Sequence, residues 1–188
     1  MSLETDNIPP VSGFILAGGR SSRMGRDKAD VKWQGVSLLN HMKMTLSTVA
    51  PRIFVVGGRY ADIPDLAPFL GPGNAIANQL LMMPASEHIA VFVPIDMPGL
   101  TPALLRYLIG QSQIQGAPVY FDSHYLPVAI PTRNLLLDKL RELLSVSPEP
   151  SVKSVLQRIG ARSLVSAGND MSFANINRPE DLKALADR

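Results

Sequence analysis

Short apolar runs that alternate with longer segments of helical periodicity constrain the fold of this chain more than any other feature. The first runs cover residues 13–17 (GFILA), 52–56 (RIFVV) and 89–94 (IAVFVP). Apolar residues at nearly every position are typical of parallel strands that are covered on both faces. The helical segments between them fit crossover helices. The sequence therefore predicts an α/β fold with a mostly parallel sheet.

The remaining pattern predicts further elements in both halves of the chain. We expect two short strands around the turn at 122–124 to form an antiparallel insertion at the edge of the sheet. The prolines and serines of residues 145–155 indicate a linker or loop, and the three prolines and two glycines of residues 64–73 indicate an irregular loop. The predicted helices are 38–49, 74–83, 102–113, 134–144, 152–159 and 179–186, and the predicted short strands are 119–121, 126–130 and 172–176.

Length and composition are those of one folded domain. The chain has 188 residues, of which 46% are hydrophobic and 18% charged, so it is too apolar for a disordered protein. We predict a loose tail at residues 1–10 and a single domain at 11–188.

Charge and cysteine content exclude several classes of function. The net charge of +2 comes without a basic block, which argues against nucleic acid as a partner. The chain has no cysteine, and its three histidines lack the spacing of a zinc hydrolase, so any metal must bind oxygen or imidazole. No apolar run approaches the ~20 residues that span a bilayer, and the N-terminus does not resemble a signal peptide. We expect a cytoplasmic protein without a membrane partner.

A glycine-rich loop, LAGGRSSRMGRDK at residues 16–28, follows the first predicted strand. Gly18 and Gly19 allow the backbone to approach a phosphate, and Arg20, Arg23 and Lys28 add positive charge around it. Alternatively, the glycines only end the strand and the basic residues are solvated. The glycines do not have the G-x-G-x-x-G spacing of the dinucleotide-binding motif. The loop is not a P-loop either, because Lys28 follows Asp27 and precedes Ala29. Dehydrogenase and P-loop ATPase functions therefore lose support.

A single aspartate, Asp96, follows the strand at 89–94 within the stretch FVPIDMPGL. Ligands of open α/β sheets bind at the carboxyl ends of the strands, where this carboxylate is expected to lie. Asp96 can hold a magnesium ion there, or it can simply form the turn before Pro98.

Three stretches together resemble one family. The loop is similar to the L-A-(A/G)-G-x-(S/G)-x-R-M-G-x-(D)-K signature of nucleotidyltransferases with a glycosyltransferase-A-like fold, and its double glycine is most similar to the molybdenum cofactor guanylyltransferases. FVPIDMPGL resembles the second motif of that family, and FANINRPEDL at 173–182 resembles its N-x-N-T-P-E-(D/E)-L ending, with Arg178 in place of threonine. This resemblance implies a three-layer α/β/α Rossmann-like domain of the nucleotide-diphospho-sugar transferase type.

The resemblance also implies roles for individual residues. Lys28, Arg23 and Asp96 would be catalytic, with Asp96 holding Mg²⁺ or, as an alternative, Mn²⁺. Asn175 and Asn177 would serve the acceptor side, or else only a turn and a helix cap. The nucleotide would be bound by Leu16, Ala17, Gly18, Gly19, Arg20, Lys28, Asp65, Gly71 and Asp96.

The activity implied is transfer of GMP from GTP to the terminal phosphate of molybdopterin, with or without bound molybdenum, and release of pyrophosphate. Molybdenum cofactor biosynthesis proteins and molybdoenzyme chaperones would be transient partners. The segment GPGNA at 71–75 differs from the G-P-L-A-G of the family, so the choice of base stays open. The alternatives are a molybdopterin cytidylyltransferase, a sugar-phosphate nucleotidyltransferase, and a non-catalytic nucleotide- or molybdopterin-binding protein.

Overall fold

Six strands form the central sheet of the computed structural model, which describes residues 10–18, 27–64, 70–83, 88–132, 137–166, 170–178 and 180–182. Only β7 is antiparallel to its neighbours, so the predicted mostly parallel sheet is confirmed. In spatial order the strands are β4 (Arg52–Val56), β1 (Val11–Leu16), β5 (Ile89–Pro94), β7 (His124–Pro131), β6 (Val119–Phe121) and β8 (Arg162–Leu164).

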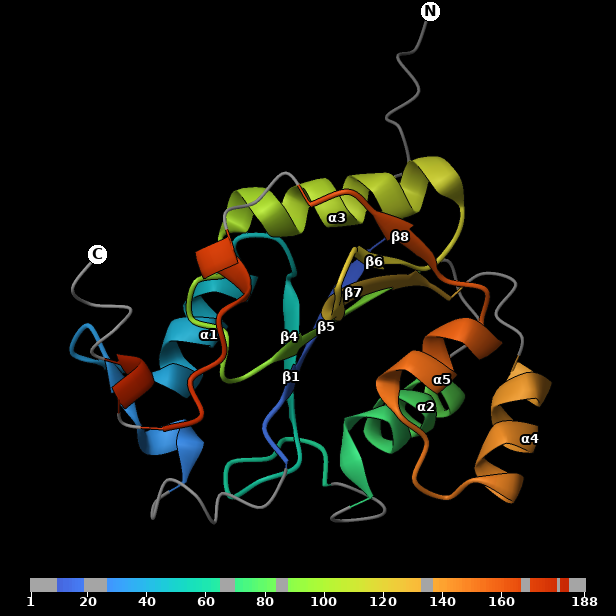
Figure 1. Ribbon diagram of the computed structural model, residues 1–188, viewed down its shortest axis with the longest axis horizontal. Helices are drawn as coiled ribbons and strands as arrows, with labels where there is room; N and C mark the ends of the chain where they lie inside the picture. The colour runs from blue at the N-terminus through green and yellow to red at the C-terminus, as the bar shows by residue number, and fades with distance from the viewer. Residues whose placement is uncertain are drawn as a thin grey trace, which may run out of the picture.

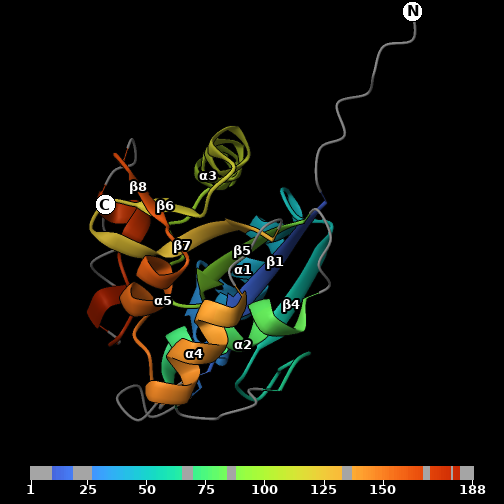
Figure 2. The same cartoon turned by 90° about the vertical axis from the view of Figure 1, so that its right-hand side faces the viewer.

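Helices cover both faces of this sheet (Figures 1 and 2). One face carries α1 (Leu38–Ser47) and α3 (Pro102–Gln115). The opposite face carries α2 (Gly71–Met82), α4 (Leu137–Val146) and α5 (Val152–Arg158). Successive side chains of a strand point to opposite faces of the sheet, so Ile15 packs in the core beside α1 and α3 and Phe14 in the core beside α2, α4 and α5. The three-layer α/β/α arrangement expected from the sequence is therefore present.

Side-chain caps fix where several helices begin. The Thr101 hydroxyl accepts the backbone N–H of Leu104, and Pro102 occupies the first turn of α3, as the sequence predicted. Ser37 and Ser151 cap α1 and α5 in the same way. Within the described residues, no helix is long and apolar enough to span a bilayer.

The predicted antiparallel insertion does not lie at the edge of the sheet. β7 pairs with β5 on one side and with β6 on the other, so it lies inside the sheet. Its run of four buried residues, Pro127 to Ile130, requires cover on both faces. The edge strand on this side of the sheet is β8, a three-residue strand with two exposed residues that gives no hydrophobic signal.

The prediction of a strand at 172–176 is also wrong. The chain there forms a short 3₁₀-helix, η3 (Asp170–Phe173), followed by an irregular segment. Phe173 in this turn and Ile176 in the irregular segment are both buried without belonging to a strand. Their apolar character therefore does not indicate a strand.

Other boundaries shift for local reasons. α2 begins at Gly71, three residues before the prediction, because the first turn of a helix accommodates Pro72. Only residues 147–151 separate α4 from α5, so most of the predicted linker is helical. Of the helix predicted at 179–186, residues 180–182 are helical, and residues 179 and 183–186 lie outside the described residues. Residues 1–9 of the predicted tail also lie outside them.

A small element not predicted from the sequence connects the glycine-rich loop to α1. It consists of the 3₁₀-helix η2 (Lys28–Asp30) and a hairpin of β2 (Lys32–Trp33) and β3 (Val36–Ser37). Its apolar side chains, Ala29, Val31 and Trp33, are buried in the core beside α1. The end of the loop is thus anchored by packing.

Candidate functional site

The carboxyl ends of β1, β4 and β5 meet at one edge of the sheet. The N–H of Ala17 donates to the Val56 carbonyl at 3.0 Å, and the N–H of Ile95 donates to the Leu16 carbonyl at 3.2 Å. A Cβ at Gly58 would lie 2.8 Å from the Ala17 carbonyl oxygen, so only glycine fits this approach. The start of the glycine-rich loop therefore lies between the two neighbouring strand ends, where α/β sheets bind ligands.

Lys28 is the first residue of η2, at the far end of that loop. The Asp27 carboxylate accepts the N–H of Ala29 at 3.0 Å and so caps the turn. Because Ala29 is buried and Val31 follows it into the core, the backbone of Lys28 has a fixed position.

Three side chains from distant parts of the chain converge, with the Lys28 ammonium at their centre. Nζ of Lys28 lies 2.7 Å from Oδ2 of Asp96 and 2.8 Å from Oδ1 of Asn177. The Lys28 and Asp96 side chains are 21% and 19% exposed, so the pair is reachable from solvent yet partly desolvated. An ammonium has three N–H donors. Since these contacts use two, a third donor remains for a ligand oxygen.

The turn that carries Asp96 is held by two hydrogen bonds and packs closely against a third segment. The Asp96 carbonyl accepts the N–H of Ile176 at 2.8 Å, and Nε2 of His41 donates to the Pro98 carbonyl at 2.9 Å. A Cβ at Gly99 would clash with the Met171 carbonyl oxygen, so glycine is required there. Neither role was predicted from the sequence. Gly99 lies within FVPIDMPGL, but His41, on α1, gives no local signal.

Asp181 was not predicted either. Its Oδ2 accepts the backbone N–H groups of Asn177 at 2.7 Å and Arg178 at 2.8 Å. These two hydrogen bonds hold the pKa of the Asp181 carboxyl below its ordinary value. The sequence signal was available, because an acidic residue three positions after a helix cap often reaches back to it.

The other predicted site residues are only partly described. Gly18 is exposed two residues after the end of β1, and Gly71 is the first residue of α2 with φ +81°. Asn175 is exposed and does not hydrogen-bond to Lys28 or Asp96. The roles predicted for these residues stay predictions. Gly19, Arg20, Arg23 and Asp65 lie outside the described residues.

The unusual segment at 71–75 has a packing role. A Cβ at Gly73 would clash with the Pro150 carbonyl oxygen, so α2 approaches the α4–α5 connection as closely as glycine allows. Buried Asn74 donates through Nδ2 to the Pro148 carbonyl at 2.7 Å and accepts from Asn78 at 2.6 Å. The departure from G-P-L-A-G is thus explained by contacts within the chain.

The oxygen donors of the cluster have the chemistry that Mg²⁺ requires. Magnesium sites use one or two carboxylates, water and substrate phosphates, and they do not need a full protein cage. The described part of the chain has no group of three or more His, Cys, Asp or Glu side chains arranged for a metal. The partly exposed Asp96 carboxylate, with the Asn177 amide oxygen nearby, fits a site completed by phosphates.

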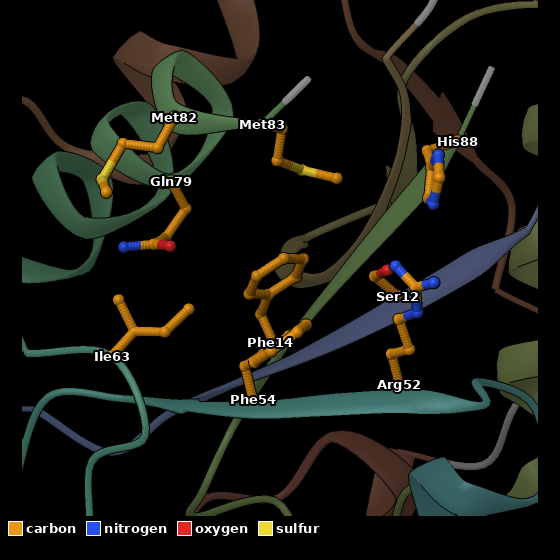
Figure 3. Close-up of a pocket in the computed structure, with 9 residues that line it drawn as sticks. All are labelled: Ser12, Phe14, Arg52, Phe54, Ile63, Gln79, Met82, Met83 and His88. Carbon is orange, nitrogen blue, oxygen red and sulfur yellow. The ribbon is translucent and has the colours of Figure 1, made fainter. Parts of the chain in front are cut away.

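A separate hollow of about 290 Å³ lies along β1 and β4 beside the end of α2 (Figure 3). Phe14 and Phe54 lie at its base, Met82 and Met83 on one side, and Arg52 and His88 on the other. It shares no lining residue with the Lys28 cluster.

The family model described as a MobA-like NTP transferase domain matches residues 13–171. The chain belongs to the MobA-like NTP transferase family. Among its relatives, a molybdenum cofactor guanylyltransferase of Xanthomonas euvesicatoria is 38% identical over 186 residues, with 94% of each chain covered. A molybdenum cofactor guanylyltransferase of Pseudomonas paraeruginosa is 30% identical, covering 92% of this chain and 93% of the relative.

Solved structures share the fold of this MobA-like chain. Molybdopterin-guanine dinucleotide biosynthesis protein A of Archaeoglobus fulgidus has a TM-score of 0.71 at 21% identity, with 94% of this chain and 97% of that chain covered. The 2-C-methyl-D-erythritol 4-phosphate cytidylyltransferase of Thermus thermophilus has a TM-score of 0.62 at 18% identity, with 94% and 97% covered. These similarities show the fold alone and do not decide the nucleotide.

Proposed function

We propose that this protein transfers GMP from GTP to the terminal phosphate of molybdopterin, forming molybdopterin guanine dinucleotide and pyrophosphate. The observation that supports this most directly is the Lys28, Asp96 and Asn177 cluster at the carboxyl edge of the sheet. The names of the relatives, which are similar over more than nine-tenths of the chain, favour guanine and molybdopterin over other substrates.

The reaction needs alignment and charge neutralisation more than proton transfer. An oxygen of the molybdopterin phosphate attacks the α-phosphorus of GTP, and the bond to the β-phosphate oxygen breaks to release pyrophosphate. The nucleophile is already an anion, so no general base is required. A cluster with one ammonium, one carboxylate and one amide suits this chemistry.

Lys28 has the clearest role in this proposal. Its remaining N–H donor binds a phosphate oxygen of GTP, while Asp96 and Asn177 keep the ammonium directed toward the site. Charge that builds on the pyrophosphate leaving group is then stabilised by a cation whose position is set before the substrate arrives.

Asp96 would hold the magnesium ion together with the phosphates of the substrate. Bound there, Mg²⁺ would supply positive charge that offsets the negative charge of the phosphates. Asn177, and Asn175 two residues before it, would orient the acceptor. In the proposed triphosphate site, the loop contributes the backbone of Gly18 and Gly19 and the side chains of Arg20 and Arg23. Asp65 and Gly71 would contact the nucleotide.

Location and protein partners belong to the same proposal. The absence of cysteine suits a reducing compartment, which supports the cytoplasm. Delivery of molybdopterin and removal of the product would require brief contacts with cofactor biosynthesis proteins and molybdoenzyme chaperones.

Pyrophosphate release tests the proposal. Wild-type protein with GTP, Mg²⁺ and molybdopterin should release pyrophosphate, and Lys28→Ala or Asp96→Ala should reduce the rate by at least about 100-fold, because each removes a preorganised charge. Lys32→Ala is the matched control, since Lys32 is exposed on β2 only four positions away. Circular dichroism checks that the variants are folded. Unchanged turnover in a folded Lys28→Ala or Asp96→Ala variant would refute the assignment.

A further inference from the structure

Asn177 needs support to serve the site. It is exposed and lies in an irregular segment between η3 and the last helical turn. A side chain in such a segment samples several rotamers unless its backbone is held. On one side the backbone is held by Ile176, which is fully buried and donates its N–H to the Asp96 carbonyl.

Asp181 holds the other side. One carboxylate oxygen, Oδ2, accepts the N–H groups of both Asn177 and Arg178, and the N–H of Asp181 donates to the Arg178 carbonyl at 3.1 Å. The contact from Asp181 back to the Arg178 N–H is the acidic half of a capping box, in which an acid reaches back over the start of a helix. The arginine side chain at 178 has no acceptor, so it cannot cap the turn itself.

We propose that Asp181 is a positioning residue for the transfer reaction. It fixes the backbone of Asn177, Asn177 then presents Oδ1 to Lys28 at 2.8 Å, and Lys28 is paired with Asp96. Asp181 acts through Asn177 and does not touch the substrate. This inference rests on the proposed function, because the role is defined by the reaction at Lys28 and Asp96.

A purely electrostatic role and a purely structural role for Asp181 would each give a different result. If Asp181 acted only by its negative charge near Lys28, Asp181→Asn would lose as much activity as Asp181→Ala. If its oxygen matters because it accepts the two N–H groups, Asp181→Asn retains the function, since an amide oxygen also accepts them. If Asp181 only stabilised the helix, its removal would leave the Asn177 side chain in place.

Steady-state transfer kinetics separate these roles. Asp181→Ala should lower kcat about tenfold, as loss of a supporting hydrogen bond commonly does. Asp181→Asn should stay within about twofold of wild type, and so should Glu180→Ala, which removes an equal charge from the exposed neighbouring position. Adding Asp181→Ala to Asn177→Ala should cost less than about twofold more, because both changes remove the same contact. Full additivity, or a wild-type rate for Asp181→Ala, overturns the inference.

A second measurement does not depend on turnover. In nuclear magnetic resonance spectra, Asp181→Ala should accelerate exchange of the Asn177 and Arg178 backbone amides and shift the Asn177 side-chain amide signal in the same direction as Lys28→Ala does. If exchange accelerates while that side-chain signal stays unchanged, Asp181 is only a helix cap and the inference fails. A wild-type protein without transfer activity would instead contradict the proposed function, and the spectra would still decide whether Asp181 positions Asn177.

Discussion

Nζ of Lys28 lies 2.7 Å from Oδ2 of Asp96, across a sequence separation of 68 residues. The contact joins the end of the glycine-rich loop to the turn after β5, and both lie at the carboxyl edge of the sheet. The ammonium is therefore directed and partly neutralised by contacts within the chain. If the pair binds the triphosphate as proposed, little free energy is spent on reorganising these side chains when the substrate binds.

The pair should show a measurable coupling in stability. Lys28→Ala, Asp96→Ala and the double variant form a double-mutant cycle, and we expect a coupling of about 1 kcal/mol because the side chains are only partly desolvated. Urea unfolding measures the change in the free energy of unfolding of each of the three variants relative to wild type. Additivity within about 0.3 kcal/mol would show that the two charges do not interact in solution.

Glycine substitutions should distinguish packing from helix propensity. Gly73→Ala should destabilise the protein by about 1–3 kcal/mol, because the new Cβ would meet the backbone at Pro150 and Ser151. Gly110→Ala in α3 is the matched control, since a Cβ there meets nothing within 4 Å. It should stabilise by about 0.5–1 kcal/mol, the usual gain of alanine over glycine in a helix. Equal effects in thermal unfolding would contradict the close contact at Gly73.

Tyr60 should give a stability contribution that disappears in alkali. Its hydroxyl donates to Oδ1 of Asp30 at 2.8 Å, and this hydrogen bond raises the pKa of Tyr60 above its ordinary value of 10.0. Because the folded-state pKa is the higher one, the contribution is complete below about pH 10 and is lost as pH rises through the folded-state pKa. Tyr60→Phe should therefore be less stable than wild type at about pH 8 and equal to it at high pH. Urea unfolding at both pH values measures this, and a difference independent of pH would argue against the bond.

The parallel part of the fold was predictable because strands buried on both faces have an unambiguous signal. All six residues of β5 are apolar, and five of them are fully buried. The position of β7 was not predictable, since local sequence does not tell which neighbours a strand takes. Phe173 and Ile176 were misassigned because burial from an irregular segment and burial from a strand give the same apolar letters.

Motifs in the sequence predict the residues of the candidate site, but they do not predict the neighbouring residues that hold those side chains in place. Lys28, Asp96 and Asn177 each lie in a recognisable stretch, and the structure brings their side chains together. His41 supports the Asp96 turn from α1 through a single contact with a backbone carbonyl. Such contacts depend on how helices pack, so no local pattern predicts them.

Formation of one specific dinucleotide is the sharpest experimental check on the proposed activity. Wild-type protein is given molybdopterin, Mg²⁺ and an equimolar mixture of GTP, CTP, UTP and ATP, and the products are separated and identified by mass spectrometry. We expect molybdopterin guanine dinucleotide as the main product, with its formation lost in Lys28→Ala and retained in Lys32→Ala. A cytosine dinucleotide as the main product, or no dinucleotide from folded wild-type protein, would contradict the account.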